Sequence, residues 1–101
     1  MGSMTVDLES EQHARIAIHL LTEPGKAKVG ARIAALGAPQ VARALAREHE
    51  PVVALDSLAQ AVAGQLARAA AAGVTCVVPG TPEWPRQLDD LDDSRPVVLW
   101  V

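Results

Sequence analysis

The residues of this chain that could do chemistry begin with a basic stretch. Between residues 26 and 47 there are five basic side chains and no acidic one, whereas both flanks are net acidic. The free N–H groups of a helix N-terminus, beside cationic side chains, can bind a phosphate. We therefore predict DNA contact through Lys26, Lys28, Arg32 and Arg43. The alternative is a solvated helix face, since Gly25 and Gly30 are too far apart for a tight Gly-x-Gly hairpin.

Other candidate chemistry is weaker. An acidic cluster could suggest a divalent metal, but a calcium loop needs alternating ligands around a central glycine, which is missing here; the cluster is Asp89, Asp90, Asp92 and Asp93. His13 and His19 fall on the first predicted helix and His49 near the end of the third, and Cys76 lies in a run of valines. We therefore predict no catalytic residue, no metal and no cofactor, and a chain that is not an enzyme.

The two tryptophans allow two interpretations. Trp84 and Trp100 could stack on bases, as aromatic side chains do in proteins that bind single strands. However, prolines frame Trp84, and leucines follow it at packing distance. We favour a structural anchor, formed by Trp84, Pro85, Leu88, Pro96 and Trp100.

The composition bounds the fold class. Half of the 101 residues are apolar, yet Phe and Tyr are absent, so the core must consist of Ala, Val, Leu and Ile, which suits packed helices. The single cysteine excludes an intrachain disulfide and favours a cytoplasmic location. No apolar run is long enough for a membrane span. Residues 1–3 are expected to be a vector remnant before the native start.

Periodicity predicts a compact helical bundle over residues 4–72. We expect helices from Ser10 to Thr22, from Lys26 to Leu36, and from Pro39 to about residue 50. A fourth helix should be capped by Asp56 and end at Gly73. Residues 52–55 are ambiguous between a short strand and a connection.

Residues 73–101 differ from the helical part because their pattern predicts short strands as well as a helical turn. Residues 74–78 read as a short buried strand, residues 86–91 as a helical turn, and residues 96–101 as a second strand-like run. Such a late strand–helix–strand pattern cannot complete a sheet. We therefore expect the truncated start of an α/β domain, whose unpaired strands could make the chain dimerise.

The segment 73–88 resembles the start of the Rossmann-like domain of DNA-processing proteins of the DprA/Smf family. The resemblance rests on Gly73, the apolar strand that follows, Trp84-Pro85 and Leu88, and continues in a Pro-x-x-Leu-aromatic element from Pro96 to Trp100. Residues 10–72 are similar to the family's sterile-alpha-motif-like or helix-hairpin-helix-like domain. That part of the match rests on Leu21, Gly25, Val29-Gly30 and Leu36-Gly37.

The resemblance implies a role in natural transformation. A protein of this family binds incoming single-stranded DNA, forms homodimers and helps to load the recombinase RecA. The family segments for those tasks correspond to sequence beyond Val101, so this chain would be at most a weak DNA- or protein-contact module. The alternatives are a free-standing helical protein-interaction domain and the leading segment of a Rossmann-like nucleotide-processing enzyme.

Overall fold

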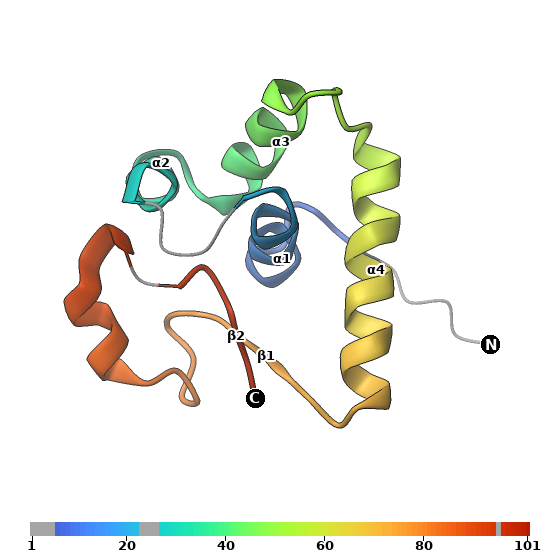
Figure 1. Cartoon of the computed structure of the whole chain (residues 1–101). Helices are drawn as coiled ribbons and strands as arrows, with labels where there is room; N and C mark the ends of the chain where they lie inside the picture. Colours follow the sequence, from blue (N-terminus) through green and yellow to red (C-terminus); the bar gives the residue numbers. More distant parts are fainter. Residues whose placement is uncertain (1–5, 23–26, 95) are drawn as a thin grey trace.

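The computed structural model describes residues 6–22, 27–94 and 96–101 (Figure 1). These residues form a compact, mainly helical molecule, as the composition predicted. None of the helices among them is long and apolar enough to cross a membrane. In chain order the elements are α1 (Glu11–Leu21), α2 (Ala27–Leu36), α3 (Ala38–Glu48), α4 (Leu55–Ala71), β1 (Cys76–Val77), the 3-10 helix η1 (Arg86–Ser94) and β2 (Leu99–Trp100).

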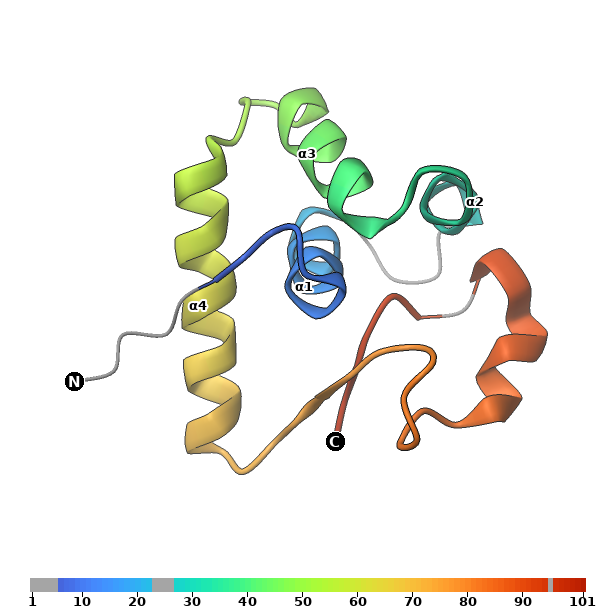
Figure 2. The same ribbon diagram turned by 180° about the vertical axis from the view of Figure 1, so that it is seen from behind.

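Helix α1 is the centre of the molecule. Both views place α2, α3 and α4 around it, with the two strands alongside (Figures 1 and 2). The predicted start is confirmed, because the Ser10 side chain accepts a hydrogen bond from the N–H of His13. Ile16 and Ile18 are fully buried, whereas Leu20 is 39% exposed.

Glycines follow two of the helices in the described part of the chain. Gly37 and Gly73 both have positive φ, at 86° and 73°, and stand where α2 and α4 end. The predicted cap of α4 is wrong. The helix begins at Leu55 after Ala54, which supplies no side-chain cap, so Asp56 already lies in the first turn. There its charge still favours the helix N-terminus.

The two strands pair with each other in antiparallel register, Cys76 opposite Trp100 and Val77 opposite Leu99. The expectation of unpaired strands is therefore wrong. Both strands are also shorter than predicted. Before β1 begins, the N–H of Val74 donates a hydrogen bond to the carbonyl of Ala69 in the last turn of α4. An antiparallel pair of this size does not establish a Rossmann-like sheet.

The outer edge of β1 is closed by side chains of the same chain. Thr75 and Val101 exchange backbone hydrogen bonds, so the alternate carbonyls of Cys76 and Val78 point away from β2. The Gln12 side chain donates to the Cys76 carbonyl at 3.1 Å, and the Thr81 hydroxyl donates to the Val78 carbonyl at 2.8 Å. These bonds leave the β1 edge with few acceptors for another strand.

Helix α1 also forms a hydrogen bond to the segment that leads into β2. Arg15 is a buried cation, its side chain only 7% exposed, and it donates to the Val97 carbonyl at 2.9 Å while pairing with Glu11. Apolar side chains of the strand region complete the same core as the helices, namely Cys76, Val78 and Val98. The sheet therefore packs on the helical unit as part of one core.

Candidate functional site

The structure brings two of the predicted DNA-contacting residues together. Lys28 and Arg32 lie one turn apart on α2 and line the same open groove, which has a volume of about 510 Å³. Most of the remaining lining is apolar, and it comes from the end of α1, from α2 and from α3: Leu20, Leu21, Thr22, Val29 and Leu45. Lys26 lies outside the described residues.

Arg32 is already bound to a carboxylate. Two of its guanidinium nitrogens each lie 2.9 Å from an oxygen of Glu48, at the end of α3. This side-chain hydrogen bonding raises the pKa of Arg32 and lowers the pKa of Glu48. Both side chains are well exposed, so solvent screens the pair and an incoming anion can compete with Glu48.

Arg43 is not part of this groove. It forms an ion pair with Glu9, which precedes α1. Each residue of an α-helix is rotated by about 100° from the one before it. Arg43 and the groove residue Leu45 are two positions apart, so they point to different sides of α3. Two of the three described candidate cations therefore have a carboxylate partner within the chain.

An acidic element also lies next to the basic helix. The 3-10 helix η1, which contains Asp89 and Asp90, packs against α2 (Figure 1). The acidic flanks seen in the sequence are thus folded back towards the basic stretch. A phosphate backbone approaching α2 would meet carboxylates as well as cations.

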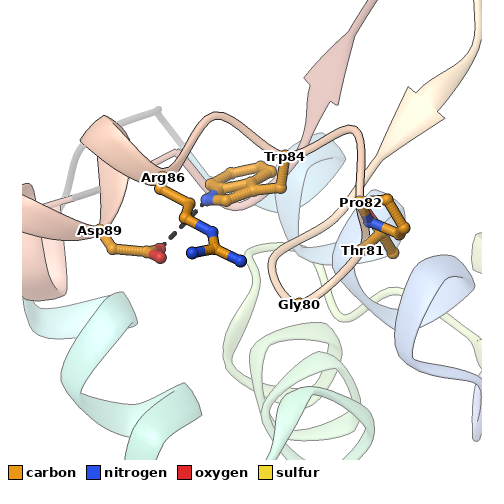
Figure 3. Close-up of a pocket in the computed structure, with 6 residues that line it drawn as sticks. All are labelled: Gly80, Thr81, Pro82, Trp84, Arg86 and Asp89. Carbon is orange, nitrogen blue, oxygen red and sulfur yellow. Dashed lines mark hydrogen bonds between the residues drawn. The ribbon is translucent and has the colours of Figure 1, made fainter.

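A second hollow lies in the loop between β1 and η1. Figure 3 shows its walls, and the Trp84 indole N–H there donates to Asp89 at 3.1 Å. Only 4% of Trp84 is exposed, so base stacking would require the loop to open. The hollow measures about 350 Å³ and is lined by Gly80, Thr81, Pro82, Trp84, Arg86 and Asp89.

The other predicted anchor residues differ in how far they are buried. Trp100 packs against the core, with its ring centroid 6.4 Å from that of His19 at a tilt of 57°. Its indole N–H is buried and has no hydrogen-bond partner among the described residues. Leu88 and Pro96 are half-buried, whereas Pro85 is exposed.

The thiol of Cys76 and the acidic side chains are further groups that could do chemistry. Burial raises the pKa of the Cys76 thiol to about 11, which makes it a poor nucleophile at neutral pH. In the ranges that the structure describes, no three His, Cys, Asp or Glu residues gather as metal ligands. Sequence reasoning missed Arg15 and Gln12, because nothing in the local pattern shows that polar α1 residues meet strands more than 60 positions away.

Comparison with known proteins assigns no family to this chain. No family, no curated protein and no solved structure matches it.

Proposed function

We propose that this chain is the N-terminal accessory module of a DNA-processing protein of the DprA/Smf family, and that it acts by contact with protein rather than by catalysis. The family assignment is supported by the motif from Gly73 to Trp100.

The observation that carries the contact role is the groove between α1, α2 and α3. Most of its lining residues are apolar, and Lys28 and Arg32 line it as well. Nonspecific DNA binding needs several free cations that neutralise phosphates. Here Arg43 is paired with Glu9 and does not line the groove, and the apolar lining side chains complement a protein better than a phosphate backbone.

In the whole protein, we assign the DNA tasks to the part that would follow this module. Binding of single-stranded DNA, dimerisation and loading of RecA would belong to a Gly-rich, basic α/β domain. The module would position that domain or a partner through the groove. DNA contact by the basic stretch itself stays a prediction, and a titration tests it directly.

The family proposal is tested by reading the coding sequence beyond Val101 in its natural gene. We expect it to continue into a Gly-rich α/β sequence. A stop codon at that point would support a free-standing interaction domain and contradict the proposal. A continuation with paired catalytic acids and an arginine at a phosphate loop would instead support a nucleotide-processing enzyme.

A further inference from the structure

The groove on α1, α2 and α3 is lined by apolar side chains and by two cations. Leu20 is 39% exposed at its wall, and Val29 and Leu45 contribute further apolar surface. Its volume of about 510 Å³ lies within the range of sites that bind ligands or side chains. Apolar surface of this kind is stabilised when another apolar group covers it.

The charge on the groove has one sign. Lys28 and Arg32 are its only charged lining residues among those described, and both are cations. They are four residues apart on α2, which places them about 6 Å apart along the helix axis. Glu48 shows that a carboxylate fits Arg32, since it binds there through both oxygens.

We propose that this groove binds an acidic amphipathic helix from a protein partner. Apolar side chains of that helix contact the leucine-lined floor, and carboxylates one turn apart bind Lys28 and Arg32, displacing Glu48. This inference deepens the proposed contact role by naming the class of partner. Duplex DNA fits less well, because its bases are stacked inside and it presents phosphates, but no apolar side chain, to the groove.

The test uses a labelled peptide as the probe. It has leucines at i, i+3, i+4 and i+7 spacing, flanked by glutamates on the adjoining face, and binding to the whole chain is followed by fluorescence anisotropy. We expect saturable binding that weakens by about tenfold in Lys28→Glu and in Leu20→Asp. Because both positions are exposed at the groove, circular dichroism should show unchanged helicity for each variant.

Matched controls distinguish specific binding in the groove from nonspecific binding. Arg68→Glu changes an exposed cation on α4, away from the groove, and should bind the peptide as the natural chain does. The same peptide with lysines in place of glutamates should not bind. Equal binding by all variants, or by the lysine peptide, would overturn the inference.

Two further outcomes complete the test. An oligonucleotide that binds the groove cations more tightly than the acidic peptide would overturn the inference in favour of DNA contact. A failure of peptide binding would also overturn it, but would leave the family assignment standing, because the coding sequence beyond Val101 tests that assignment independently.

Discussion

Replacement of Arg15 by methionine tests whether the hydrogen bond from α1 to the segment before β2 stabilises the fold. Methionine keeps most of the apolar stem but removes the charge and the donor that binds the Val97 carbonyl at 2.9 Å. A hydrogen bond from a charged donor contributes about 1.5–3 kcal/mol to stability. The pair with Glu11 adds little, because the Glu11 side chain is 52% exposed. We therefore expect Arg15→Met to lower the free energy of unfolding by about 2 kcal/mol.

Urea denaturation followed by circular dichroism measures this change. With a slope of about 1 kcal/mol per molar urea, the midpoint should fall by about 2 M. Arg68→Met is the matched control, because Arg68 is exposed and its side chain donates to Gln65 on its own helix. It should change stability by less than about 0.5 kcal/mol. If Arg15→Met destabilises the chain no more than this control, the reasoning about the buried cation is refuted.

Three smaller predictions follow from the same contacts. Gln12→Ala removes the donor to the Cys76 carbonyl and should cost about 1 kcal/mol in a urea titration, with no loss arguing against the closed β1 edge. Ser10→Ala removes the α1 cap and should lower the Tm by about 4–8 °C in a thermal melt, whereas an unchanged Tm would contradict the capping role. Because the pKa of the Cys76 thiol is raised to about 11, alkylation at pH 8 should be about 100-fold slower than for the urea-unfolded chain and should accelerate as pH rises; comparable rates would refute the burial.

The helices were predictable because local signals set them. Ser10 caps α1, and glycines with positive φ follow α2 and α4, as the sequence indicates. The antiparallel pairing of the strands was not predictable, since no local pattern records which segments meet. The same limit applies to the site. The basic stretch was visible, but its pairing with Glu48 and Glu9 depends on how α3 and the start of the chain fold back.

The charge pattern of the sequence did not predict the charges around α2. In Figure 1 the acidic helix η1, near the C-terminus, lies beside α2. A count of charges along the sequence treats the basic stretch as free. In the fold, carboxylates from distant positions lie beside it. Charge segregation in sequence was therefore a poor guide to charge segregation in space for this chain.

We infer that the module acts through protein contact, because apolar side chains and two cations line the same groove. An anisotropy titration of labelled single-stranded DNA tests this most directly, at about 50 and 200 mM salt, beside a Lys28→Glu/Arg32→Glu variant. We predict a Kd weaker than about 100 µM at the higher salt, with little difference between the two proteins. Micromolar binding that falls about 50-fold between the two salt concentrations, as four phosphate contacts would require, and that the variant abolishes, would contradict the claim.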